Sequence, residues 1–175
     1  EAENVWTPTA TNTAGSKRLV DGNFIQTAVR SRGAVLIWTD TALYQMQFIG
    51  PPFTFGFNQL GSACGCIGLH AAVDVGGISF WMGTDSFFLF DGAVQKIPCT
   101  VQDYVFDDLN QNAKQDIFCA ANTDFNEVMW FYPSAATAAA QAGRPRPGVR
   151  AWIRHRQDAR RGRGVFHGEE RGGGW

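Results

Sequence analysis

Short apolar runs separated by small polar turns make up most of the chain between residues 24 and 132. Residues 78–92, ISFWMGTDSFFLFDG, are typical: an apolar run, a Gly-Thr-Asp turn, a second apolar run, and then Asp-Gly. Such runs bounded by turn residues are typical of β-strands. Asp-Gly and Gly-Gly supply the positive φ angles that two-residue hairpin turns require. The pattern predicts antiparallel hairpins. It indicates that this stretch is a structural part of the fold and not a recognition site.

Three tryptophans divide the chain into units. Trp38, Trp81 and Trp130 lie in apolar runs 43 and 49 residues apart, about the length of a propeller blade. A short strand and a turn precede each of these runs, and in the first two units a third and a fourth strand follow. We therefore expect an all-β fold, a β-propeller-like fragment of about two and a half four-stranded antiparallel blades over residues 24–136. The three tryptophans should occupy equivalent places in it.

Three further segments complete the expected organisation. Residues 1–23 are predicted to be extended, and residues 100–115 have apolar positions spaced for one short helix between the second and third units. Residues 137–175 hold nine Arg and three acidic residues, whereas residues 1–136 hold six Lys or Arg and 13 acidic residues. This Arg/Gly/Ala-rich tail is predicted to be irregular, with at most one short strand or helical turn near Trp152.

The composition limits the class of protein. No run approaches the roughly 18 apolar residues that cross a bilayer, and the first residues lack the pattern of a signal peptide, so we expect a non-secreted chain without a membrane anchor. The first residue is Glu1 and the first methionine is Met46. Either the start has been processed away or the chain is a piece of a longer protein, and we favour the second interpretation.

Candidate metal ligands are few. The four cysteines are Cys64, Cys66, Cys99 and Cys119, and His70 lies four residues after Cys66. A zinc site normally pairs two Cys or Cys/His units, and no second unit follows. We expect inert thiols on buried strands, with a transient Cys/His site as the alternative, and we assign no metal or cofactor.

Acidic residues give two candidate groups. Asp103, Asp107 and Asp108 cluster in the expected helix, where acids at a helix start are the simpler explanation. Asp40 and Asp85 fall at equivalent turns of successive units, which suggests a propeller-scaffold glycoside hydrolase with paired carboxylates as one alternative function. Repeated turn chemistry explains these two residues more simply, so we assign no catalytic residue and expect no enzyme.

A sugar- or receptor-binding module is the other alternative. It needs exposed aromatic side chains, for which Tyr44 and Trp6 are candidates, whereas the three strand tryptophans are expected in the core. His155 and His167 lie in the tail without nearby chemical partners in the sequence.

Four blocks resemble a known family. WTPTATNTAGSKRL, IWTDTALYQMQFIGPPFTFGFNQLG, FWMGTDSFFLFDGAVQKIPCTVQDYVFDDLN and EVMWFYPSA, between Trp6 and Ala136, are similar to the tail hub or nozzle proteins of short-tailed bacteriophages and their prophages, also called packaged-DNA stabilisation proteins. The resemblance implies a virion structural protein on a β-propeller, located in the virion tail and assembled in the host cytoplasm. It also implies a homo-oligomeric ring that contacts portal, adaptor and spike or needle proteins and lines the DNA exit channel.

The tail departs from this family, whose members continue after the EVMWFYPSA block with further aromatic strands. The reversal of charge near Ala136 suggests that a frameshift or truncation replaced those strands. The alternative is a functional basic tail, whose nine arginines would make non-specific contacts with the DNA backbone. Sequencing the gene and its flanks would separate the two, because a frameshift requires aromatic strand repeats in another reading frame.

Overall fold

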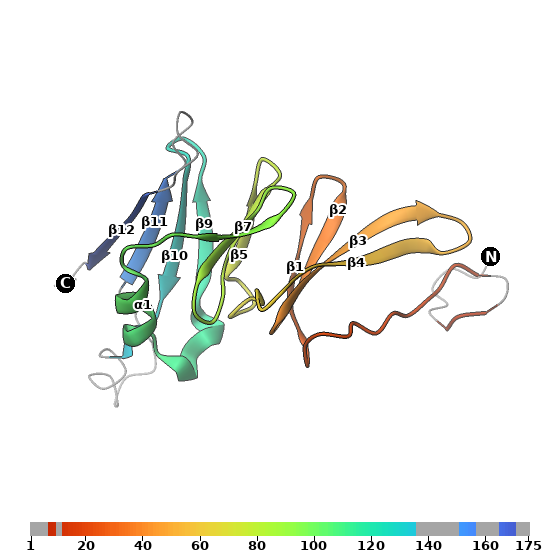
Figure 1. The fold of residues 1–175 in the computed structure, drawn as a ribbon, viewed down its shortest axis with the longest axis horizontal. Helices are drawn as coiled ribbons and strands as arrows, with labels where there is room; N and C mark the ends of the chain where they lie inside the picture. The colour runs from red at the N-terminus through yellow and green to blue at the C-terminus, as the bar shows by residue number, and fades with distance from the viewer. Residues whose placement is uncertain (1–6, 10–11, 136–150, 157–164, 171–175) are drawn as a thin grey trace.

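The structure of the 175-residue chain is a computed structural model that describes residues 7–9, 12–135, 151–156 and 165–170, the last two as backbone only. Three four-stranded antiparallel sheets follow one another along the chain (Figure 1), and in each the strands lie in sequence order. Sheet 1 contains β1 (Ile25–Ser31), β2 (Ala34–Thr39), β3 (Ala42–Gly50) and β4 (Thr54–Ser62). Sheet 2 contains β5 (Ala72–Val75), β6 (Ile78–Met82), β7 (Phe87–Phe90) and β8 (Val94–Ile97). Sheet 3 contains β9 (Phe118–Asn122), β10 (Glu127–Tyr132), β11 (Ala151–Arg156) and β12 (Val165–Glu170).

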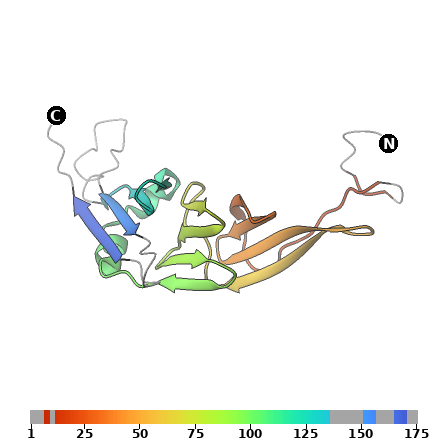
Figure 2. The same ribbon diagram turned by 90° about the horizontal axis from the view of Figure 1, so that it is seen from above.

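The sheets stand side by side as propeller blades do (Figures 1 and 2). The first strands β1, β5 and β9 lie next to one another. The backbone N–H of Cys119 donates to the carbonyl of His70 at 2.8 Å, which joins the start of β9 to the connection before β5. Within the described part of the chain the three blades form an open row, not a closed ring. The predicted all-β class with successive four-stranded units is confirmed.

The third unit corrects two predictions. β11 and β12 lie in the tail, so the expectation of at most one strand there is wrong, and three units are present where two and a half were expected. β11 pairs along the whole of β10, with Trp130 opposite Ile153 and Phe131 opposite Trp152. Without this partner the edge of β10 would leave backbone N–H and C=O groups unpaired, so the ladder offsets the cost of ordering the segment. Whether the rest of residues 137–175 is irregular lies outside the described residues.

The core lies between the sheets and is built on the three tryptophans, each 0% exposed. The indole Nε1–H of Trp81 donates to the carbonyl of Cys64 at 2.8 Å, and that of Trp130 donates to the carbonyl of Ala71 at 3.1 Å. Both indoles therefore point back toward the preceding sheet. Residues 78–92 form β6, β7 and the turn to the outer strand of sheet 2, as predicted.

Trp38 is offset by one position from the other two tryptophans, although all three lie in the second strand of their sheets. Trp38 faces Leu43 across β2 and β3, as Met82 faces Phe87 across β6 and β7. The residue of sheet 1 that corresponds to Trp81 is therefore Ile37. Because neighbouring strand residues project from opposite faces, Trp38 points forward to sheet 2 and meets Trp81 edge-on, with ring centroids 5.4 Å apart. The prediction of equivalent places is correct for the strand and wrong by one residue for the register.

The turns follow the predicted chemistry in one case and depart from it in another. Gly76 and Gly77 both have positive φ, +61° and +84°, and form a two-residue turn between Val75 and Ile78. Asp91-Gly92 does not form a two-residue turn, because Phe90 pairs with Val94 and leaves the three residues 91–93 in the connection. The Asp91 side chain accepts a hydrogen bond from the N–H of Ala93 and so closes this longer loop.

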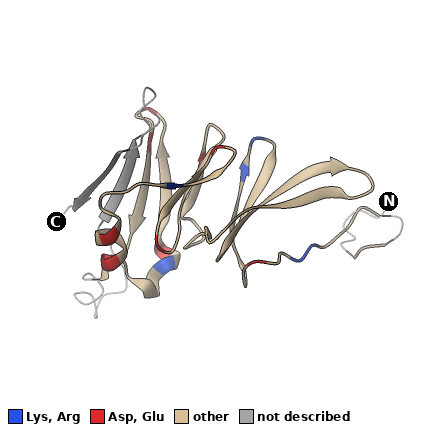
Figure 3. Cartoon of the chain, in the orientation of Figure 1, with Lys and Arg blue, Asp and Glu red and all other residues tan. Residues whose placement is uncertain are grey.

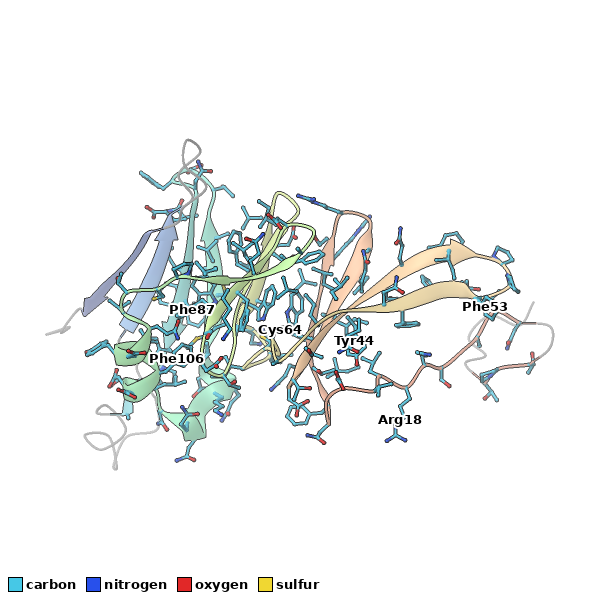
Figure 4. All side chains as sticks on the ribbon, in the orientation of Figure 1. Arg18, Tyr44, Phe53, Cys64, Phe87 and Phe106 are labelled. Carbon is cyan, nitrogen blue, oxygen red and sulfur yellow. The ribbon has the colours of Figure 1, made fainter. Side chains whose placement is uncertain are left out.

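The predicted helix is present as α1 (Gln102–Asp108), followed by a short 3₁₀ helix, η1 (Gln111–Asp116). Val105 is buried, and the ring of Phe106 lies 5.5 Å from that of Phe87 in β7. Figure 4 shows both phenylalanines on the side of sheet 2 that faces sheet 3. The helical connection thus fills the space beside these two blades.

Candidate functional site

The hairpin of β3 and β4 extends beyond the row of blades (Figures 1 and 2). Met46 pairs with Phe57 at the position where Phe90 pairs with Val94 in sheet 2. Beyond this pair, sheet 1 connects its third and fourth strands through residues 47–56, whereas sheet 2 uses only residues 91–93. We call residues 47–56 the arm. It is the main difference between two otherwise similar blades.

The end of the arm is apolar on every side. Phe48 pairs with Phe55 across the ribbon, and their rings meet edge-on at 5.9 Å. Ile49 projects from the opposite face, where its Cγ2 would lie 3.1 Å from a Cβ placed on Gly56. Phe53 lies at the apex (Figure 4). The exposed fractions are 63% for Phe48, 57% for Ile49, 77% for Phe53 and 46% for Phe55.

The arm carries no charge. No Lys, Arg, Asp or Glu occurs between Asp40 and Asp74, and the arm is uniformly tan in Figure 3. The sequence pattern predicts two ordinary strands in this segment and does not predict the arm. The available signals were the long uncharged run and the Pro-Pro pair at its centre.

Residues 19–23 cross the face of sheet 1 that points away from sheet 2, and we call them the strap. Leu19 packs against the cluster of Ile37, Ala42 and Tyr44. The N–H of Asp21 donates to the hydroxyl of Tyr44 at 2.7 Å. Tyr44 is 5% exposed, so the suggestion that it binds sugar or receptor as an exposed aromatic is wrong. Trp6, the other residue suggested for this role, lies outside the described residues.

A hollow of about 320 Å³ lies between the strap and sheet 1. Residues 17–19, 22–25 and Thr39 line it. Lys17 and Arg18 are exposed, and Figure 4 shows the Arg18 side chain pointing away from the sheet. The Arg18 guanidinium is therefore not aimed into the hollow, which makes the hollow a poor candidate for an anion site.

Asp40 and Asp85 do not occupy equivalent positions. When the two blades are aligned by their strand pairs, Trp38 corresponds to Met82, and Asp40 therefore corresponds to Thr84. Asp40 accepts hydrogen bonds from the backbone N–H of Asn23 at 2.8 Å and from its side-chain amide at 3.0 Å. Desolvation acts to raise the pKa of the Asp40 carboxyl, but these hydrogen bonds hold that pKa below its ordinary value. Asp85 lies 3.9 Å from Lys96 at the surface. The repeat therefore gives no support to a carboxylate pair.

The acidic residues of α1 have separate positions. Asp103 lies in the first turn, as predicted, whereas Asp107 and Asp108 lie at the end of the helix, so the explanation as helix-start acids is wrong for those two. The hydroxyl of Ser134 donates to Asp108 Oδ1 at 2.6 Å. Asp108 thus ties α1 to the residues that follow β10.

All four cysteines are free, and only Cys119 lies in a strand. The expectation of thiols on buried strands is therefore wrong for Cys64, Cys66 and Cys99, which lie in connections. Burial raises the pKa of the Cys66 thiol to about 12. Burial, and then the nearby Cys66, raise the pKa of Cys119 well above its ordinary value. Such thiols are protonated and unreactive near neutral pH.

No group of three or more His, Cys, Asp or Glu residues close enough to hold a metal ion occurs in the described residues. The side chain of His70 is exposed. His155 and His167 lie in β11 and β12, where they pair with Val128 and Arg154 respectively. The structure does not describe their side chains.

One further apolar surface lies on sheet 3. Phe118 and Phe131 stack with ring centroids 4.5 Å apart, and Met129 shares their face of β10. Phe118 is 40% exposed, while Phe131 and Met129 are partly exposed. The alternate residues Val128, Trp130 and Tyr132 are buried on the other face. Sheet 3 therefore presents a moderately exposed apolar face that the described residues do not fully cover.

No protein-family model matches the sequence, and no curated protein matches it at a significant level. None of the described helices is both long enough and apolar enough to cross a bilayer.

Proposed function

We propose that the chain is a non-catalytic structural component of the tail hub, or nozzle, of a short-tailed bacteriophage or prophage. In this role its blades form part of the wall around the DNA exit channel below the portal. The chain would assemble as a homo-oligomeric ring in contact with portal or adaptor proteins and with a tail spike or needle.

The observation that carries this proposal is the position of the resembling blocks in the blade row. The block that begins IWTDTALY covers the end of β2, then β3 with the arm and most of β4; FWMG with FFLFDG lies in the middle strands of sheet 2, and EVMWFY forms β10. These three blocks thus supply strands of the blades, whereas the block WTPTATNTAGSKRL precedes β1 in the sequence. Trp38, Trp81 and Trp130 are buried in the core, where they stabilise the blades and are not available to bind a ligand.

The hydrogen bonds made by the polar residues that were candidates for catalysis or binding also support a structural role. Asp40 accepts hydrogen bonds from Asn23, the last residue of the strap, and Tyr44 binds Asp21 within it. Asp108 ties α1 to Ser134. These side chains stabilise the fold through hydrogen bonds to neighbouring segments.

The test is the location of the chain in particles. Virions purified from a lysate of the bacterium that carries the gene would be labelled with an antibody against residues 12–135. We expect label at the single tail vertex, and we expect particles from a deletion strain to lose packaged DNA unless the gene is supplied in trans. Absence of the chain from intact virions, or label spread over the capsid, would contradict the proposal.

A further inference from the structure

We propose that the arm is a lipid-binding element that inserts its end into the interface of a membrane with neutral headgroups. The inserted side chains are Phe48, Ile49, Phe53 and Phe55, which together form a compact, exposed apolar surface at the end of a two-stranded ribbon. Apolar surface of this kind marks an interaction site with a protein or a membrane. This inference is independent of the role in a phage tail.

The distribution of the apolar side chains favours lipid over a protein groove. Phe48 and Phe55 lie on one face of the ribbon, Ile49 on the other, and Phe53 at the apex (Figure 4). A shallow groove in a protein surface covers one face of a ribbon and leaves the other in water. A bilayer surrounds an inserted ribbon on all sides, so it buries all four side chains.

The absence of charge sets the kind of membrane. Asp40 and Asp74 are the nearest charged residues in the sequence on either side of the arm, so insertion buries no charge of the arm itself. The arm also has no Lys or Arg to attract anionic lipid. Binding should therefore occur on neutral phosphatidylcholine and should not weaken as salt is raised.

The backbone at the apex suits an apolar environment. Pro51 and Pro52 have no N–H, which removes two donors that lipid cannot satisfy. The N–H of Phe55 donates to the carbonyl of Phe53 at 2.6 Å. The most exposed part of the ribbon thus has fewer unpaired donors than an ordinary hairpin turn.

Polar side chains at the base of the arm set the depth of insertion. Gln47 and Asn58 are exposed and uncharged, and they lie on the paired strands behind the aromatic end. Their amides can hydrogen-bond among headgroups while the end reaches the acyl boundary. The amide of Gln59, the next residue along β4, donates instead to the Asp21 carboxylate of the strap. This geometry describes shallow, reversible binding, not a membrane span.

Flotation with vesicles of phosphatidylcholine alone tests the proposal on the full 175-residue chain. The variant Phe48→Ser/Phe53→Ser removes two exposed rings of the arm. Phe125→Ser is the matched control, because Phe125 is 62% exposed and lies between β9 and β10, away from the arm. Tryptophan fluorescence of all proteins confirms that the buried core is unchanged.

We expect wild type and Phe125→Ser to float with the vesicles equally, and the double variant to lose binding by at least about tenfold. In Phe53→Trp, we expect brominated phosphatidylcholine to quench fluorescence in excess of the quenching seen in wild type. The proposal is overturned if wild type does not float, if the double variant floats as well as wild type, or if binding requires anionic lipid. It is also overturned if the double variant instead reduces the sedimentation mass without vesicles, because the arm would then contact a second copy of the chain.

Discussion

At the scale of single residues, the three core tryptophans differ in their hydrogen bonding. Trp81 and Trp130 donate to backbone carbonyls, whereas the Nε1–H of Trp38 is buried and finds no hydrogen-bond partner among the residues that the structure describes. An unpaired buried donor costs free energy, while a paired one stabilises the fold. The cause is the forward orientation of Trp38, which places its indole against the ring of Trp81.

This difference gives a prediction for one substitution made at two sites. Trp38→Phe and Trp81→Phe remove similar volumes, but only Trp81→Phe breaks a hydrogen bond. We expect Trp81→Phe to lower the free energy of unfolding by about 0.5–1.5 kcal/mol more than Trp38→Phe does. Urea denaturation of both variants measures the difference, and equal losses would show that the Trp81 bond to Cys64 contributes nothing.

A larger truncation tests the role of Trp81 as a structural residue of the core. Trp81 is 0% exposed, so Trp81→Ala should lower the free energy of unfolding by about 3–5 kcal/mol through the cavity that it leaves. Phe125→Ala, at an exposed turn, should change it by less than about 0.5 kcal/mol. If the two variants unfold at the same urea concentration, the sheet 1 and sheet 2 interface is not the core of the fold.

The buried thiol of Cys66 makes stability depend on alkaline pH. Its pKa is raised from an ordinary 9.0 to about 12, so between these values the unfolded chain loses the proton and the folded chain keeps it. The free energy of unfolding should therefore fall as pH rises from 9 toward 12. Below pH 9 the thiol is protonated in both states, so the stability is not reduced there. Urea midpoints from pH 8 to 11 should fall less steeply for Cys66→Ala than for wild type. Parallel slopes would mean that Cys66 ionises as readily in the folded state.

At the scale of elements, the arm should be dispensable for folding. None of the apolar side chains of residues 47–56 is among those that pack on the main core cluster, whereas Met46 and Phe57 at their base pack on the cluster of sheet 1. Replacing residues 47–56 with Asp-Gly-Ala, the sequence of residues 91–93, should therefore change the free energy of unfolding by less than about 1 kcal/mol. Thermal unfolding by circular dichroism measures this, and a large drop in melting temperature would show that the arm supports the sheet.

The order of strands could be predicted from sequence because turn residues and apolar runs are local signals. The offset of Trp38 was also encoded locally: Trp38 is five residues after Gly33, but Trp81 is four residues after Gly77. Alignment on the tryptophans hid this difference. β11 could not be predicted in the same way, because Arg150, Arg154 and Arg156 flank its short apolar segment, and the compensating ladder with β10 is a non-local contact. The exposure of the arm likewise depends on the length of β3 and β4 relative to the blade beside them.

At the scale of the whole molecule, the tail completes the last blade, which gives a prediction for its removal. A chain that ends after residue 136 lacks β11 and β12 and leaves one edge of β10 unpaired. Such an edge is a template for pairing with other chains. We expect this truncated chain to self-associate more than the full chain in sedimentation velocity. A chain that ends after Glu170 keeps both strands and should behave as the full chain does, and equal behaviour of all three would show that β11 does not protect β10.

The edge-on contact of Trp38 and Trp81 also provides an intrinsic spectroscopic probe of the contact between the first two blades. The two indoles belong to different sheets, and their rings lie 5.4 Å apart at an interplanar angle of 61°. Chromophores this close and not parallel couple their electronic transitions, which produces a paired signal in the circular dichroism spectrum. The signal depends on the distance between blades and not on the integrity of either blade alone. Its loss during unfolding, compared with the loss of the strand signal, would therefore show whether the first two blades separate before they melt.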